Sequence, residues 1–256
     1  MPENHELLKQ FDEFRGQPDE GLDTLKEWSP DRTECRIVKL ANNIKNIPAV
    51  IAEEKKIAQI NNVKLEWKVY SHDSLPGIKE DLVSAGFVAE DEETVMFFPV
   101  EKEFSADLKT IKQDHSIKIV HINRPSDLEK VAEISKQIGR KNFDSEKKQF
   151  AKILTDNPES LEIFVLLCND DPASCGRIYY PEKSPFAELA GGRTKSHYRN
   201  QGFFTLLVQH RIKQARLRKR THIFVDALPT SQPALSKLGF QVLTKTQPFM
   251  FDPQKG

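Results

Sequence analysis

Apolar and polar residues follow two different periods along this chain. Alternation with a period of two, as in residues 63–70, predicts a strand with one buried face. Apolar residues three to four positions apart, as at Leu7, Leu8, Phe11 and Phe14, predict an amphipathic helix. In the first part of the chain the two patterns predict helices at about 1–30, 47–60 and 74–85, and strands at 34–40, 63–70, 87–88 and 95–98.

A second series of elements begins after residue 116. Residues 161–168 are almost continuously apolar, which is typical of a strand buried on both faces. Ser126 and Glu129 have the spacing of a capping box and predict the start of a helix. The predicted strands are 117–122, 161–168, 175–180, 186–194, 223–225 and 240–251, and the predicted helices are 126–138, 145–154, 202–219 and 231–238. This order, β-α-α-β-β-β-α-β-α-β, predicts an α/β fold with a mixed sheet.

A polar, weakly patterned segment separates the two series. We therefore expect a smaller N-terminal domain at 1–104, a linker at 105–116 and a second domain at 117–256.

The segment 197–205 joins a predicted strand to a predicted helix. Gly202 at this junction allows the backbone to approach a ligand closely. The free N–H groups and the positive dipole end of the helix attract anions. The segment therefore predicts a site for a phosphate-bearing ligand.

Composition excludes several classes of protein. The 38 basic and 38 acidic residues of the 256-residue chain balance, which argues against general nucleic-acid binding. No apolar run approaches the roughly 20 residues that span a membrane, and the polar N-terminus predicts no signal peptide. Cys35, Cys168 and Cys175 have no metal-binding spacing, so we expect no metal, and such few, scattered cysteines favour a cytoplasmic protein.

Residues 117–251 resemble the GNAT (Gcn5-related N-acetyltransferase) superfamily. The pyrophosphate loop of that family starts with Arg or Gln, has Gly three residues later, and ends with Gly or Ala two residues further on. Arg199, Gly202 and Phe204 stand at these positions here. The segment 238–240, Leu-Gly-Phe, is similar to the ending that the family shows after its last helix.

Phe204 departs from the family pattern, and this departure resembles a GNAT subgroup that has an aromatic residue there. The tract 225–233 is also similar to that subgroup. Residues 66–73 and 86–87 resemble its degenerate GNAT-like N-terminal half, so the resemblance implies a tandem GNAT-like chain. The first half lacks the pyrophosphate loop and is assigned no CoA site.

The resemblance implies that acetyl-CoA is the cosubstrate. Backbone N–H groups of 200–205 would bind its pyrophosphate, and backbone groups of the strand 186–194 would bind its pantetheine arm, much as an added strand pairs with an open edge. Two adjacent glycines in that strand, 191–192, also fit a β-bulge that would open the cleft. The residues assigned to this site are Gly192, Thr194, Arg199, Asn200, Gln201, Gly202, Phe203, Phe204 and Thr205.

Candidates for catalysis are fewer. Acetylation of an amine needs a base for its proton and an acid for the leaving thiolate. Glu188 lies on the strand where GNAT enzymes often place a base, although it is equally read as a solvated or paired carboxylate. Leu235 occupies the position where many members have a Tyr that protonates the leaving thiolate. Ser231 or a water is then the candidate acid, or the thiolate leaves without one. No cysteine stands out as an acyl carrier, so we expect direct transfer.

From Arg193 to Arg220 the chain has nine basic residues and no acidic one. They predict either a positive field for the phosphates of CoA or, for 216–220, a solvated face at the end of a helix. Few aromatic residues accompany them, which argues against nucleic acid as a partner.

The leading hypothesis is an acetyl-CoA-dependent N-acetyltransferase whose acceptor is a small-molecule or peptide amine. One alternative is a CoA-binding sensor or interaction protein without catalysis. Another is an aminoacyl-tRNA-dependent transferase built from two GNAT-like halves. The sequence leaves a homodimer open and does not name the acceptor.

Overall fold

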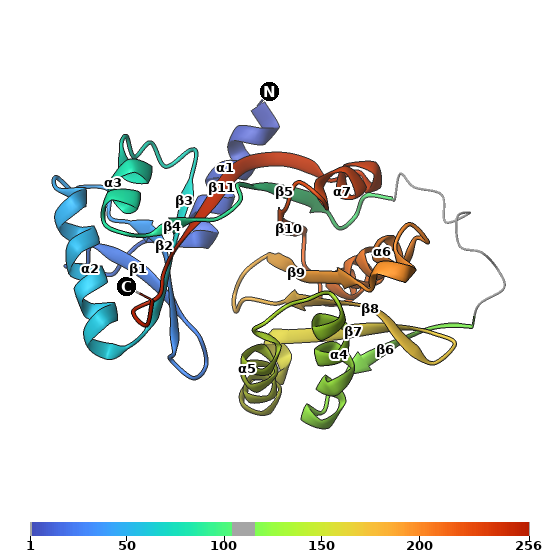
Figure 1. Ribbon diagram of the computed structural model, residues 1–256. Coiled ribbons are helices and arrows are strands. Elements are labelled where there is room, and N and C mark those ends of the chain that lie inside the picture. Colours follow the sequence, from blue (N-terminus) through green and yellow to red (C-terminus); the bar gives the residue numbers. More distant parts are fainter. Residues whose placement is uncertain (1, 104–115, 256) are drawn as a thin grey trace. The chain divides into compact units, whose positions relative to one another are not determined.

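The computed structural model describes residues 2–103 and 116–255 of the chain, which form two compact units (Figure 1). The first unit is Met1–Val95, Ala227–Pro229 and Val242–Gly256, and the second is Met96–Asp226 and Thr230–Gln241. These units differ from the domains expected at 1–104 and 117–256, because the last strand pairs with a strand of the first unit. The expected linker 105–116 lies outside the described residues except for Ser116.

The first unit is built on a mixed sheet with the strand order β1-β2-β3-β11, and β4 also pairs with β11. The β1–β2 and β3–β11 pairs are antiparallel, and the β2–β3 pair is parallel. Its strands are β1 (Thr24–Trp28), β2 (Glu34–Leu40), β3 (Lys64–Tyr70), β4 (Val88–Ala89) and β11 (Gln241–Phe251). Its helices are α1 (Pro2–Arg15), α2 (Ile47–Asn61) and α3 (Ile78–Ser84).

Apolar residues from these strands and helices form the core of the first unit. Trp67 on β3 is 2% exposed and meets Phe87 edge-on, with ring centroids 6.3 Å apart. Helix α2 begins after Asn46, whose side-chain oxygen accepts the N–H of Ala49 at 3.2 Å, and Pro48 lies in the first turn.

A buried ionic network fastens α1 within the first unit. The guanidinium of Arg15, whose side chain is 3% exposed, donates to both carboxylate oxygens of Asp73 at 2.8 Å and to Asp12 at 2.8 Å. The ring of His72 lies 2.9 Å from Asp12 and 2.8 Å from the hydroxyl of Thr244. The side chains of Asp12, His72 and Asp73 lie close enough together to bind one cation. The guanidinium of Arg15, which contacts both carboxylates, provides the positive charge at this place.

The second unit is a mixed sheet with the strand order β5-β10-β9-β8-β7-β6. Strands β6 to β9 pair antiparallel in sequence, whereas β9 and β10 are parallel. Its strands are β5 (Glu93–Pro99, which begins in the first unit), β6 (Ile117–Ile122), β7 (Leu161–Cys168), β8 (Asp171–Tyr179), β9 (Phe186–Thr194) and β10 (His222–Ala227). Its helices are α4 (Glu129–Gln137), α5 (Phe143–Asp156), α6 (Phe203–Leu217) and α7 (Gln232–Leu238), with short 3-10 turns at Pro125–Leu128, Pro158–Ser160 and Ser196–Tyr198.

Helices cover both faces of this sheet. Gly176 of β8 faces Arg211 of α6, whereas the next residue, Arg177, lies over the ring of Phe150 of α5. Because successive residues of a strand point to opposite faces, α6 lies on one face and α5 on the other. Strand β7, which is next to β8 in this sheet, is buried along its whole length, as its continuous apolar run predicts.

Most predicted elements are confirmed, and the strands 34–40, 117–122, 161–168 and 186–194 have the predicted bounds. Three details are wrong. Residues 24–28, expected to be helical, form β1. Helix α3 begins at Ile78 rather than at residue 74. The expected capping box does not form, because Asp127 instead pairs with Arg124 and Lys130 and no side chain caps this turn in the described residues.

Candidate functional site

One edge of β9 is open along much of its length. The register between β9 and β10 has three residue pairs, from Phe186–His222 to Glu188–Phe224. Beyond Glu188, residues 189–194 of β9 pair only with β8 in the described sheet. Three carbonyls of this stretch, those of Ala190, Arg193 and Thr194, accept side-chain hydrogen bonds. The remaining outward N–H and C=O groups are available to a ligand that runs along the strand.

A β-bulge lies in this open part of β9. Arg193 pairs with Cys175 and Ala190 with Arg177, so two residues of β9 stand opposite the single residue between those partners on β8. These two are Gly191, with a φ of +57°, and Gly192, which is exposed. The bulge predicted from the two glycines is confirmed, and it changes the direction of β9 where pairing with β10 has ended.

The loop between β9 and α6 leaves backbone donors at the start of the helix. Asn200 and Gly202 both adopt left-handed backbone conformations, with φ of 60° and 84°. Gly202 is the N-cap of α6, and no side chain of the described residues caps this turn. The N–H of Leu206 donates to the carbonyl of Gly202 at 2.9 Å. The N–H groups of residues 203–205 precede that bond and are the unsatisfied donors of the first turn.

Two side chains anchor this loop to the start of β8. The ammonium of Lys195, 1% exposed, donates to Asp171 at 2.9 Å and to Glu133 at 2.6 Å. Tyr198 also hydrogen-bonds Asp171; burial raises the pKa of Tyr198 to about 12, and the hydrogen bond acts in the same direction. The loop is therefore held in one place before any ligand binds.

The two phenylalanines that open α6 have different environments. Phe203 is 1% exposed and belongs to the core. Phe204 is half-buried, and a Cβ placed on Gly192 would lie 2.7 Å from its ring. Apolar spacing alone would place Phe204 in the buried stripe of α6, but Phe203 takes the core position and Phe204 lies against the exposed glycine of β9.

The basic tract is largely used within the fold. Arg193 and Lys195 are buried and form ion pairs with Glu146 and Asp171, respectively. Arg211 is buried, and within the described residues its hydrogen-bond acceptors are all main-chain carbonyls. Burial lowers the pKa of Arg211 to about 10. The solvated face expected at 216–220 is wrong for three of its members: Arg216 donates to Val100 C=O at 2.8 Å, Arg218 pairs with Glu162 at 3.0 Å, and Arg220 donates to Ser184 C=O.

The remaining predicted residues lie at defined positions in the second unit. The hydroxyl of Thr194 lies 2.8 Å from that of Ser174, and Arg199 donates to the carbonyl of Thr194 at 3.3 Å. Glu188 is half-buried and forms the last residue pair between β9 and β10. Ser231 precedes α7 without capping it by its side chain, and Leu235 in α7 is 1% exposed. The chemical roles of these residues stay predictions.

Sequence reasoning did not find a group of arginines on the α5 face of the sheet. Arg193 donates to Glu146 at 2.5 and 2.7 Å and to Ser135 at 2.6 Å. Arg177 lies over Phe150 beside the bulge, and the charges of Arg177 and Arg140 act on Glu146 together with that of Arg193. The signal in the sequence is the presence of glycines inside strands, which becomes interpretable only when the facing side chains are known.

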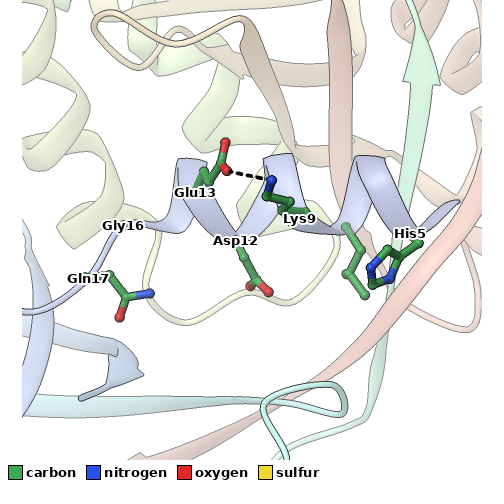
Figure 2. A pocket seen from close by; sticks show the side chains of 7 residues that line it. His5, Lys9, Asp12, Glu13, Gly16 and Gln17 are labelled. Carbon is green, nitrogen blue, oxygen red and sulfur yellow. Dashed lines mark ion pairs between the residues drawn. The ribbon is translucent and has the colours of Figure 1, made fainter. Parts of the chain in front are cut away.

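A hollow of about 580 Å³ lies along α1 in the first unit, and Figure 2 shows the side chains that line it. Lys9 and Glu13 form an exposed ion pair of 3.9 Å within it. His5 lies near one end of the helix and Gln17 beyond the other (Figure 2). None of the predicted site residues lines this hollow.

Comparison with known proteins identifies the second unit. Residues 128–240 match the family described as "Acetyltransferase (GNAT) family". This match shows a GNAT domain at residues 128–240, and the mixed α/β fold of the second unit agrees with it. No curated protein sequence matches the chain at a significant level.

Solved structures extend the similarity to most of the chain. A GCN5-related N-acetyltransferase from Kribbella flavida is 10% identical with a TM-score of 0.65, and the match covers 96% of this chain and 94% of that one. A GCN5-related N-acetyltransferase from Sphaerobacter thermophilus is 10% identical with a TM-score of 0.62, and the match covers 96% of this chain and 85% of that one. A tandem GNAT protein from the clavulanic acid biosynthesis pathway is 12% identical with a TM-score of 0.60, covering 86% of this chain and 75% of that one. At these identities the likeness shows the shared fold alone.

Proposed function

We propose that this protein is an acetyl-CoA-dependent N-acetyltransferase that transfers an acetyl group directly to an amine. The observation that carries the proposal is the uncapped start of α6 next to the open edge of β9, with the ring of Phe204 joining the two at Gly192. The GNAT domain at residues 128–240 supports it, since enzymes of this family generally use acetyl-CoA.

The chain offers groups that suit each part of acetyl-CoA. N–H groups of residues 200–205 and the positive end of α6 suit a pyrophosphate. The backbone groups of β9 around Gly192 and Thr194 that do not pair with β10 suit the amides of a pantetheine arm. Phe204 narrows this path on the α6 face, because its ring lies against Gly192. Acetyl-CoA would supply the activated thioester, and the chain would position it.

We assign the base to Glu188 and the acid to Ser231 or a water molecule. The amine nitrogen attacks the thioester carbonyl carbon, its proton passes to the carboxylate of Glu188, and the C–S bond breaks. The leaving thiolate then takes a proton from Ser231 or water. A backbone N–H of β9 beyond Glu188 would polarise the carbonyl oxygen.

The basic tract gives little support to the alternative of a tRNA-dependent transferase. Arg193, Lys195 and Arg211, which form a third of the basic tract, are buried, so they offer no charge to a polyanion.

In the described residues no helix is long and apolar enough to cross a membrane. The cytoplasmic location remains a prediction from the sequence.

Turnover measurements test the proposal. Release of CoA thiol from acetyl-CoA is followed with a panel of amines, and the three cysteines are buried, which keeps their own reaction with thiol reagents slow. We expect amine-dependent release and a kcat that falls by about 100-fold in Glu188→Gln, within the range of general base catalysis. Glu182→Gln, at an exposed carboxylate before β9, is the matched control and should leave kcat unchanged.

The result also separates the enzyme from the CoA-binding sensor. Bound acetyl-CoA without release for any amine of the panel would support the sensor. Release that is unaffected by Glu188→Gln would remove the base assignment alone.

A further inference from the structure

Arg177 has an unusual state for a half-buried arginine. Its Nε is buried without a hydrogen-bond partner, and its guanidinium makes no hydrogen bond or ion pair in the part of the chain that the structure describes. Leaving a polar group of this kind unpaired is unfavourable, and more so for a charged one. A group outside the chain that completes these bonds would therefore bind favourably.

Aromatic rings hold this guanidinium and leave its donors free. Its Cζ lies 4.5 Å from the ring centroid of Phe150 and 5.9 Å from that of Tyr179. Stacking on a ring fixes a guanidinium through its flat face, and its N–H groups, which lie in its plane, stay available.

The guanidinium lies against the backbone of β9 at the bulge. A Cβ placed on Gly191 would lie 2.7 Å from the Cζ of Arg177, and Gly191 also has a left-handed φ of +57°. The neighbouring residue, Gly192, is exposed on the open edge of β9. Arg177 therefore lies beside the stretch of β9 along which the proposed function places the pantetheine arm.

The charges around Arg177 leave a positive excess. Glu146 is the carboxylate of this group, and Arg193 already binds both its oxygens. Arg140, exposed after α4, is the third cation; partial desolvation and the charges of Arg193 and Arg177 lower its pKa. With Glu146 neutralised by Arg193, the charges of Arg140 and Arg177 remain uncompensated within this group.

We propose that Arg177, with Arg140 as a second cation, binds a carboxylate of the acyl acceptor, so that the acceptor is an amine of the amino-acid class. This inference rests on the proposed function and names its substrate. One free, planar guanidinium fork matches one planar carboxylate in two parallel hydrogen bonds. The carboxylate on Arg177 would place a nearby amine at the open edge of β9.

Pairs of acceptors that differ only in the carboxylate test the inference. The full-length protein is assayed for CoA release with glycine and methylamine, L-alanine and ethylamine, and L-lysine and cadaverine, and O-phosphoethanolamine is included. We expect kcat/KM to be about 10- to 100-fold higher for the carboxylate member of the preferred pair, the factor that a hydrogen bond to a charged group provides. Arg177→Gln should remove this preference through KM, and Arg177→Lys should restore part of it.

Lys213→Gln is the matched control, since it removes an exposed positive charge of α6 and should keep the preference. Melting temperatures confirm that each variant is folded. Equal activity on both members of every pair, or a preference that survives in Arg177→Gln, would overturn the inference. Preference for O-phosphoethanolamine over all amino acids would overturn the choice of a carboxylate.

A binding measurement keeps the inference separate from catalysis. Wild type and Arg177→Gln are titrated with N-acetyl-L-alanine and with N-ethylacetamide, which lacks the carboxylate. Binding of N-acetyl-L-alanine alone, lost in Arg177→Gln, supports the carboxylate site even if no CoA release is found. If N-acetyl-L-alanine does not bind and turnover shows no preference for the carboxylate member of any pair, the carboxylate site is ruled out. If acetyl-CoA-dependent acetylation is nevertheless found, the proposed function stands without that site.

Discussion

Replacement of Gly176 by alanine tests the close contact between strand β8 and the buried side chain of Arg211. The φ of Gly176 lies outside the left-handed region, so alanine adds no backbone strain there. Its Cβ, however, would lie 2.6 Å from the Cζ and 2.7 Å from the Nη1 of Arg211. This guanidinium is 1% exposed and is fixed by hydrogen bonds of 2.9 to 3.3 Å to three carbonyls, so it has little freedom to move away.

The magnitude follows from these contacts. Overpacking a core costs about 1–3 kcal/mol, and a lost hydrogen bond from a charged donor costs about 1.5–3 kcal/mol. We expect Gly176→Ala to lower the free energy of unfolding by about 3–5 kcal/mol, measured by urea denaturation followed by circular dichroism. Gly21→Ala is the control, because a Cβ at Gly21 meets nothing within 4 Å and its φ of +84° should cost only about 1–2 kcal/mol.

A double-mutant cycle assigns the effect to the contact itself. Methionine is flexible and makes no hydrogen bond to the carbonyls, so in an Arg211→Met background the added Cβ is tolerated. The coupling energy between the two substitutions should be about 2 kcal/mol or more. The reasoning is refuted if Gly176→Ala costs no more than Gly21→Ala, or costs the same with and without Arg211.

Two further predictions concern buried charges. Arg15→Met should lower the free energy of unfolding by about 3–5 kcal/mol, because Asp73 would lose its buried partner. Lys9→Met removes an exposed ion pair and should change this free energy by less than about 0.5 kcal/mol. Equal effects of the two variants in urea denaturation would contradict a stabilising role of the buried network. Burial acts to raise the pKa of Glu146, but the hydrogen bonds and charge of Arg193 outweigh it and hold that pKa below its usual value of about 4.3. The stabilisation is therefore present above pH 4.3 and lost as the pH falls through the lower folded-state pKa, and Glu146→Gln should flatten the acid side of the stability–pH curve; an unchanged curve would contradict the assignment.

The sequence predicts those parts of the fold in which local pattern and tertiary environment agree. Strand β7 is apolar at nearly every position and is buried on both faces, so its bounds follow directly from its composition. Gly191 of the bulge and the N-cap Gly202 were also predictable, because both have a positive φ that other residues adopt at a cost.

Features that depend on distant partners could not be predicted. Phe203 and Phe204 are adjacent in a helix, and only the position of β9 decides which of them enters the core. Arg218 pairs with Glu162, which lies 56 residues earlier in the chain, so its basic tract looked solvated from sequence alone. Arg177 becomes a candidate for the same reason, because its importance comes from what the surrounding elements leave unpaired.

Titration calorimetry with acetyl-CoA tests the central claim most directly. Gly202 and Gly77 are both N-cap glycines in left-handed conformations, with φ of 84° and 79°, so Gly202→Val and Gly77→Val impose similar backbone strain at different places. We predict micromolar binding to the wild type and to Gly77→Val, and binding at least about 10-fold weaker in Gly202→Val, because its strained turn displaces the N–H donors. Failure of the wild type to bind acetyl-CoA, or equal binding by the two variants, would contradict a CoA site at the start of α6.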